Sequence, residues 1–205
     1  MQSPFTYLLI AVTAIVSLLA FNNRKLADRL ILWPPAIDKG KQYDRLLTYG
    51  FIHADFMHLF FNMFTLFFFG GVIERLMAQL SGPWTFPLFY LSALAVSILP
   101  TYLKNQKNPA YFSLGASGAV SAVLFAFILV QPWARIIVFV IPMPAIVFAV
   151  LYVVYSIWMD RRGGDRINHG AHLAGAAYGV MFMLIMRPEV LGHFLAELSN
   201  PSLGG

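Results

Sequence analysis

A serine set among small residues opens a long apolar stretch of this chain. Ser117 lies in Gly115-Ala116-Ser117-Gly118, and residues 108–134 around it contain no Asp, Glu, Lys or Arg. A serine hydroxyl becomes a nucleophile when a base lies within hydrogen-bond reach. Small residues also let helices pack closely, and Gly118 and Ala122 have the spacing for that. Taken alone, the motif fits helix packing better than catalysis.

A histidine in a later apolar stretch is the candidate base. On a helix, His172, Gly175 and Gly179 share one face. Glycines on that face let another backbone approach closely, so we expect the imidazole of His172 to meet Ser117. His169, nearer the water, is the weaker candidate. A histidine that only hydrogen-bonds two helices is the alternative, but ionisable groups at membrane depth are expensive and mark functional sites.

A third polar cluster precedes both of these, with His53, His58 and Asn62. His58 and Asn62 are four residues apart, so both side chains point donors from one helical face. Acyl transfer needs such donors where negative charge develops on the substrate carbonyl. Taken alone, such a pair is more often a helix–helix hydrogen bond. Beside a serine and a histidine, we favour the oxyanion role.

Other protease chemistries lack their residues. There is no His-Glu-x-x-His sequence, so a zinc mechanism lacks its usual ligands. The nine acidic residues lie at the ends of apolar stretches or between them, so no intramembrane aspartate pair is present. Asp165 precedes His172 by about 10 Å along a helix, too far to orient its ring. A Ser117–His172 dyad is favoured, and we expect no cofactor and no metal.

Composition places the chain in a membrane. Hydrophobic residues make up 59% of the 205 residues and charged residues 11%, roughly half the charged share of a soluble domain. A hydrocarbon core of about 30 Å needs about 20 apolar residues in a helix. We therefore predict an all-α membrane protein, one domain of residues 1–205, with six transmembrane helices. Its expected spans are about 5–21, 56–73, 84–103, 115–131, 136–158 and 168–186.

Three local features refine this prediction. The first stretch lacks a charged n-region and a cleavage site, so we expect a retained helix and not a signal peptide. Residues 22–55 contain Trp33-Pro34-Pro35 and mixed charge, which predicts a first loop embedded in the membrane interface. Pro142 and Pro144 predict an irregular start of the fifth helix. The chain has no cysteine and hence no disulfide.

The cations are distributed unevenly between the two sides of the membrane. Three of them, Arg75, Arg135 and Arg187, lie on the side opposite to the other eleven, which are residues 24, 25, 29, 39, 41, 45, 104, 107, 161, 162 and 166. Counting alone places the crowded side in the cytoplasm and the N-terminus outside. The net charge of +5 is scattered over loops, which favours contact with anionic lipid over nucleic-acid binding.

Together these motifs resemble the rhomboid family of intramembrane serine proteases. The matching residues are His58-x-x-x-Asn62, Gly115-Ala116-Ser117-Gly118 and Ala171-His172-x-x-Gly175, on the second, fourth and sixth spans. Gly70-Gly71-x-x-Glu74-Arg75 and Arg45-Leu46-Leu47-Thr48 also match, so the resemblance covers nearly the whole chain.

The resemblance implies a rhomboid-like bundle of six helices around a water-filled cavity. It implies a Ser117–His172 pair, oxyanion donors from His58, Asn62 and the Ser117 backbone N–H, and supporting glycines at positions 115, 118 and 175. Substrates would be single transmembrane helices admitted beside the second and fifth helices, with the loop after the fifth as a cap. The family also implies a cytoplasmic N-terminus, which we prefer to the cation count because an embedded first loop weakens that count.

Two departures from the family stand out. Many members have Trp-Arg in the first loop, where this chain has Asp44-Arg45. Well-studied bacterial members have a tyrosine four residues after the serine, packed against the base, where this chain has Ser121. Another residue must therefore hold His172.

The expected function is intramembrane serine endopeptidase, through an acyl-enzyme, in a multi-pass protein of a bacterial inner membrane. Its partners would be single-pass transmembrane substrates and the lipid bilayer, with no nucleic acid. The alternative is a non-catalytic rhomboid-like protein that binds or escorts other membrane proteins; such relatives lack the serine or the histidine. A small-solute transporter fits less well, because no inverted repeat is visible.

Overall fold

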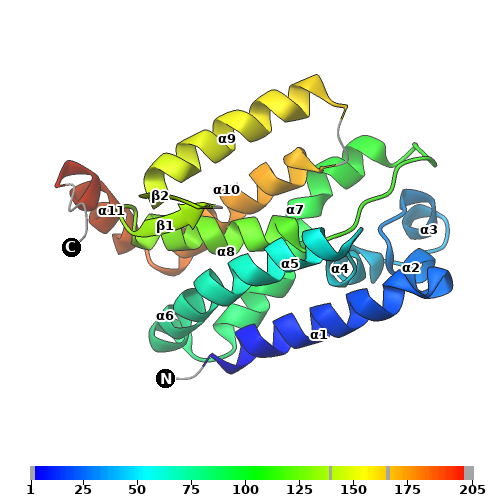
Figure 1. The fold of residues 1–205 in the computed structure, drawn as a ribbon, viewed down its shortest axis with the longest axis horizontal. Coiled ribbons are helices and arrows are strands. Elements are labelled where there is room, and N and C mark those ends of the chain that lie inside the picture. Colours follow the sequence, from blue (N-terminus) through cyan, green and yellow to red (C-terminus); the bar gives the residue numbers. More distant parts are fainter. Residues whose placement is uncertain (1–2, 139, 165–166, 201–205) are drawn as a thin grey trace.

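The computed structural model of the chain describes residues 3–138, 140–164 and 167–200. Asp165, considered above as a partner of His172, and Arg166 lie outside these residues. Most of the described chain is helical, apart from one short hairpin (Figure 1). The helices are α1 (Pro4–Phe21), α2 (Arg24–Leu30), α3 (Pro34–Asp38), α4 (Arg45–Thr48), η1 (Tyr49–Phe51), α5 (Phe56–Thr65), η2 (Leu66–Gly70), α6 (Gly71–Ser81), α7 (Thr85–Asn105), α8 (Ser117–Val130), α9 (Ala145–Arg162), α10 (His169–Met186) and α11 (Glu189–Ser199).

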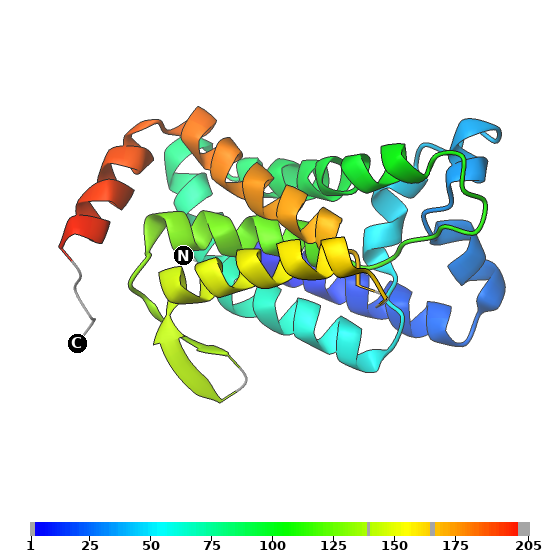
Figure 2. The same cartoon turned by 90° about the horizontal axis from the view of Figure 1, so that it is seen from above.

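Helix α8 is the centre of the bundle. Every residue from Gly118 to Leu129 is buried. Figure 2 shows α7 and α10 on one side of α8, and α1 and α5 on the other, with α9 crossing above. An apolar helix without a polar face is typical of a position surrounded by other helices. The element that begins with Ser117 is thus enclosed by the rest of the chain.

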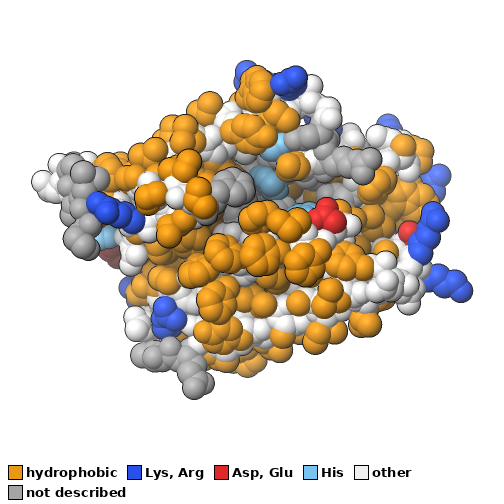
Figure 3. Space-filling model, viewed as in Figure 1, with side chains coloured by type: hydrophobic (Ala, Val, Ile, Leu, Met, Phe, Trp, Pro, Cys, Tyr) orange, Lys and Arg blue, Asp and Glu red, His pale blue; other side chains and the backbone are white. Residues whose placement is uncertain are grey.

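The outer helices have the length and composition of membrane spans. Among the described residues, Pro4–Phe21, Phe56–Ser81, Thr85–Asn105 and His169–Met186 are long and apolar enough to cross a bilayer, and Ser117–Val130 is apolar but shorter. Large hydrophobic side chains cover the face seen in Figure 3, and most of the cations there lie toward its ends. The chain is an integral, multi-pass membrane protein built as a helical bundle.

Two helices differ from the predicted spans. The second was predicted to end near residue 73 but continues to Ser81, because the Glu74 carboxylate is buried and accepts hydrogen bonds from the first turn of α1. The fifth was predicted to begin at residue 136, but residues there form a hairpin of β1 (Arg135–Val138) and β2 (Ile141–Pro144). Helix α9 begins only after Pro144, because proline cannot donate within a helix. The amphipathic helix α11 was not predicted.

Residues 22–55 fold into the short helices α2, α3, α4 and η1 at one end of the bundle (Figure 1). This loop holds the segment that leads to Ser117: Leu32 bridges to Ser113, and the Trp33 indole N–H donates to the Pro109 carbonyl. Arg45, matching the family motif, is buried and donates to two carbonyls of the loop, while Asp44 pairs with Arg29 at 2.7 Å. Asp44 and Arg45, where many family members have Trp-Arg, therefore both make contacts that anchor the loop.

Candidate active site

The structure brings Ser117 and His172 into direct contact. The Oγ atom of Ser117 lies 2.7 Å from Nε2 of His172. Ser117 is the first residue of α8, and His172 lies in the first turn of α10. Asn168 caps that turn by accepting from the Ala171 N–H at 3.0 Å. Both side chains are half-buried, so a serine and a base meet where solvent can still reach them.

Glycines set this distance by letting two backbones touch. A Cβ atom on Gly175 would lie 2.0 Å from the carbonyl oxygen of Gly118, and one on Gly179 would lie 2.1 Å from that of Ala122. No side chain fits between α8 and α10 at these positions. Gly118 and Ala122 therefore do serve close packing, and that packing is what carries His172 to Ser117. The two interpretations of the serine motif are compatible.

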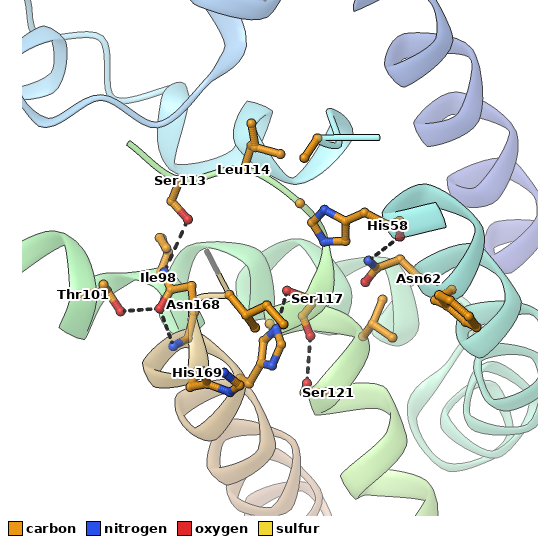
Figure 4. A pocket seen from close by; sticks show the side chains of 18 of the residues that line it. His58, Asn62, Ile98, Thr101, Ser113, Leu114, Ser117, Ser121, Asn168 and His169 are labelled. Atoms are coloured by element: carbon orange, nitrogen blue, oxygen red, sulfur yellow. Dashed lines mark hydrogen bonds between the residues drawn. The ribbon is translucent and has the colours of Figure 1, made fainter. Parts of the chain in front are cut away.

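A cavity of about 1180 Å³ surrounds the pair. It is lined by α5, α8, α9 and α10 together with the loops before α8 and α10. In Figure 4, Ser117 faces His58 and Asn62 across this space, and the loop residue Ser113 lies beside Asn168. Histidine side chains are visible in a hollow between hydrophobic surfaces in Figure 3. The cavity therefore joins a polar centre to the outside between α5 and α9.

His58 and Asn62 lie on the cavity side of α5, as their spacing predicted. Gly115 has φ +110°, and a Cβ there would lie 2.5 Å from Cε1 of His58, so this position requires glycine. The Asn62 amide donates one hydrogen bond to the His58 carbonyl at 2.9 Å, which leaves a second N–H on the same nitrogen. The backbone N–H of Ser117, at the start of α8, has no partner within its helix. These donors lie around the Ser117 hydroxyl.

His53 has a role that the sequence did not reveal. It is buried, and its Nε2 accepts from the Ala116 N–H at 3.3 Å. Its Nδ1 therefore carries the proton and donates to Ser17 Oγ at 2.9 Å, while Ser17 donates to the Phe51 carbonyl. Burial lowers the pKa of His53 to about 3. A neutral His53 thus fixes the backbone just before Ser117.

The ring beside the base comes from α9. Tyr152 stacks on His172 with ring centroids 6.1 Å apart and planes 20° apart. Ser121 lies behind Tyr152 and hydrogen-bonds its hydroxyl at 2.6 Å. The sequence could not identify Tyr152, because Phe148, Tyr152 and Tyr155 recur along one apolar stretch. His169 is buried, edge-on to His172 at 5.8 Å, and does not replace it beside Ser117.

Among the described residues, no group of three or more His, Cys, Asp or Glu is placed to hold a metal ion. The reactive groups that the geometry brings into contact are the Ser117 hydroxyl and the His172 imidazole.

A comparison with protein families matches residues 40–189 to the family described as "Rhomboid domain". RHOMBOID-like protein 12, mitochondrial, of Arabidopsis thaliana is 34% identical over 170 residues, 77% of this chain and 50% of that protein. Rhomboid protein 1, mitochondrial, of Saccharomyces cerevisiae is 33% identical over 65% of this chain and 39% of that protein. Presenilin-associated rhomboid-like protein, mitochondrial, of Homo sapiens is 31% identical over 67% and 36%. The matched region spans half or less of each of these relatives.

Proposed function

The chain belongs to the rhomboid family, and on this premise we propose that it is an intramembrane serine endopeptidase. The observation that carries the proposal is the 2.7 Å contact between Ser117 Oγ and His172 Nε2 inside a cavity that reaches the outside. A non-catalytic role in binding or escorting membrane proteins needs no such contact. A nucleophile and base within hydrogen-bond reach, by contrast, are the minimum for acyl transfer.

In the first step of the proposed reaction, Ser117 Oγ attacks the carbonyl carbon of a substrate peptide bond. Nε2 of His172 takes the Oγ proton, so its imidazole starts neutral, with its proton on Nδ1. The negative charge that develops on the substrate oxygen is stabilised by the Ser117 N–H, the second N–H of the Asn62 amide and the His58 ring. The loss of one such donor typically costs about 10²–10³ in rate.

In the second step the tetrahedral intermediate collapses and the C–N bond breaks. The imidazolium of His172 returns its proton to the leaving amine, and an ester between substrate and Ser117 remains. Water then gives a proton to His172 as it attacks the ester, and His172 passes this proton to Ser117 Oγ as the ester bond breaks and the acid product leaves. We propose that this water reaches Ser117 through the cavity that surrounds the pair.

The substrates we propose are single-pass transmembrane proteins. The cavity is lined on one side by Met57 and Phe61 of α5 and on the other by Phe148 of α9. These apolar residues suit an apolar segment that enters from lipid between the two helices. Small or helix-breaking residues near the cut would expose the peptide bond that Ser117 must reach. Gly163, Ile167 and Asn168, between α9 and α10, line the cavity, and part of the expected cap lies outside the described residues.

The test is covalent labelling of the purified protein in detergent by a fluorophosphonate, together with cleavage of a model transmembrane substrate. We expect labelling and cleavage by the wild type, and neither by Ser117→Ala. His172→Ala should reduce both to background, because Ser117 then has no base. Undiminished cleavage by either variant, or a wild type that the probe does not label, would contradict the proposal.

The compartment is a further part of the proposal. The relatives above are named as mitochondrial, so they give no support to the bacterial inner membrane expected from the sequence. We therefore propose a mitochondrial membrane. Except for Arg45, the first-loop cations are exposed on the protein surface, and the side of the membrane on which they lie is part of the proposal. A cysteine introduced at Gly163, in a chain without cysteine, would report which side carries the cavity mouth.

A further inference from the structure

The imidazole of His172 lies between two aromatic rings. Tyr152 of α9 is offset-stacked on one side, with ring centroids 6.1 Å and planes 20° apart. His169 meets it edge-on, with centroids 5.8 Å and planes 74° apart. Both distances fall in the range over which ring pairs attract each other. These two rings define the plane of the His172 imidazole. Of the two, His169 lies on α10 with His172, whereas Tyr152 lies on α9.

The Tyr152 hydroxyl is connected to the backbone of Ser117. Ser121 Oγ lies 2.8 Å from the Ser117 carbonyl oxygen, which can only accept, so Ser121 donates its single proton there. In the 2.6 Å contact between Ser121 and Tyr152, the donor must therefore be the phenol. Tyr152 consequently contacts both partners: its ring meets the base, and its hydroxyl reaches the nucleophile's own carbonyl through one serine.

Helix α9 is largely exposed. Of its 18 residues only Ala145, Ala149 and Ser156 are buried. Tyr152 is half-buried and lines the cavity, where it also lies near Phe125 of α8 at 5.5 Å. Tyr155, on the next turn, packs edge-on against His169 at 5.6 Å. Tyr152 is the α9 side chain that stacks on His172 itself.

We propose that Tyr152 is a positioning residue for His172 in the proposed reaction. Its ring holds the imidazole in the plane that directs Nε2 to Ser117, and its hydroxyl, through Ser121, holds the ring. The inference rests on the proposed function. One consequence is that the base is correctly oriented only while α9 lies against α8. A displacement of α9 would break the Tyr152–Ser121 hydrogen bond and separate the two rings.

The test compares kcat and KM for a model transmembrane substrate, and the rate of fluorophosphonate labelling, in four variants. Tyr152→Phe and Ser121→Ala each remove one end of the same hydrogen bond, so each should lower kcat by about two- to tenfold. The double variant should be no slower than either single one, because the interaction is shared. Tyr152→Leu also loses the ring, and a further two- to tenfold reduction, roughly, is expected.

Tyr7→Leu is the matched control, since it removes a half-exposed tyrosine of α1 that does not line the cavity, and it should react at the wild-type rate. KM should stay within about twofold in all variants, because positioning acts on the chemical step. The proposal would be overturned if the reductions in kcat of the two single variants multiplied in the double variant. It would also be overturned if Tyr152→Leu reacted at the wild-type rate. A wild type that is not labelled would instead contradict the proposed function itself.

Discussion

The contact between α8 and α10 leads to a prediction about one methyl group. In Gly175→Ala, the new Cβ would lie 2.0 Å from the Gly118 carbonyl oxygen and 2.8 Å from its carbonyl carbon. Ordinary contacts begin near 3.4 Å. The obstacle is the backbone of a buried helix, so no side-chain rotation can remove it. The two helices must separate locally by roughly 1 Å or more.

This separation acts directly on the candidate pair. Ser117 precedes Gly118 on α8, and His172 lies one turn before Gly175 on α10. Their 2.7 Å contact would lengthen by a similar amount, beyond the range of about 3.5 Å in which a hydrogen bond is effective. A misplacement of about 1 Å can cost about 10²-fold in rate. Overpacking should also lower the free energy of unfolding by about 1–3 kcal/mol.

The assay is the rate of fluorophosphonate labelling together with thermal unfolding in detergent. Gly192→Ala, on α11, is the matched control because no atom lies within 4 Å of the added carbon. Alanine should stabilise that helix slightly, by up to about 1 kcal/mol, without changing the rate. The reasoning is refuted if Gly175→Ala reacts as fast as the wild type and unfolds at the same temperature. If Gly175→Ala is less stable but is labelled at the wild-type rate, the packing of α8 on α10 does not control the contact between Ser117 and His172.

Two further predictions concern stability. Glu74→Gln replaces one of the two carboxylate oxygens by NH2, which then faces the backbone N–H of either Phe5 or Thr6. It should lower the free energy of unfolding by about 1.5–3 kcal/mol, measured by thermal unfolding. The exposed control Glu189→Gln should not. Because the pKa of His53 is lowered by folding, the unfolded chain binds a proton at mildly acidic pH that the folded chain does not bind. The free energy of unfolding should therefore fall by up to about 1.4 kcal/mol per pH unit as the pH drops from 6.5 to about 5. In His53→Asn this part of the slope should vanish; an unchanged slope would exclude His53 as its source.

The sequence predicted the helices and the meeting of Ser117 and His172 because these depend on local rules. Apolar length determines which segments can span a bilayer, and the spacing of His172, Gly175 and Gly179 places two glycines on the face of the histidine. A close approach to another helix follows from that face alone. The same rule identified His58 and Asn62 on one side of α5. Their roles in the reaction stay part of the proposal.

What the sequence could not predict depends on partners far along the chain. Glu74 looked like the end of a span, because a charge count does not show that the N-terminus of α1 supplies donors for it. His53 looked like one more polar residue of the loop before α5, because its acceptor role depends on where the Ala116 N–H lies. Tyr152 could be identified only from the residue at which α9 begins, and the unexpected hairpin moved that residue from 136 to Ala145. In each case the residue type was visible and its partner was not.

The site is built where helices begin, and this has a physical reason. Ser117, His172 and His58 lie in the first turns of α8, α10 and α5. First-turn N–H groups carry partial positive charge, and that of Ser117 lacks a partner within its helix, so the start of α8 offers a donor where the proposed oxyanion would form. The N–H groups of His58 and His172 already donate to the Asp55 carboxylate and the Asn168 carbonyl. Helix α8 has 14 residues and rises about 21 Å, roughly 9 Å less than the hydrocarbon core. A helix of this length that reaches one face of the core at Val130 would leave Ser117 below the other face, so the proposed reaction needs the cavity around Ser117 to admit water.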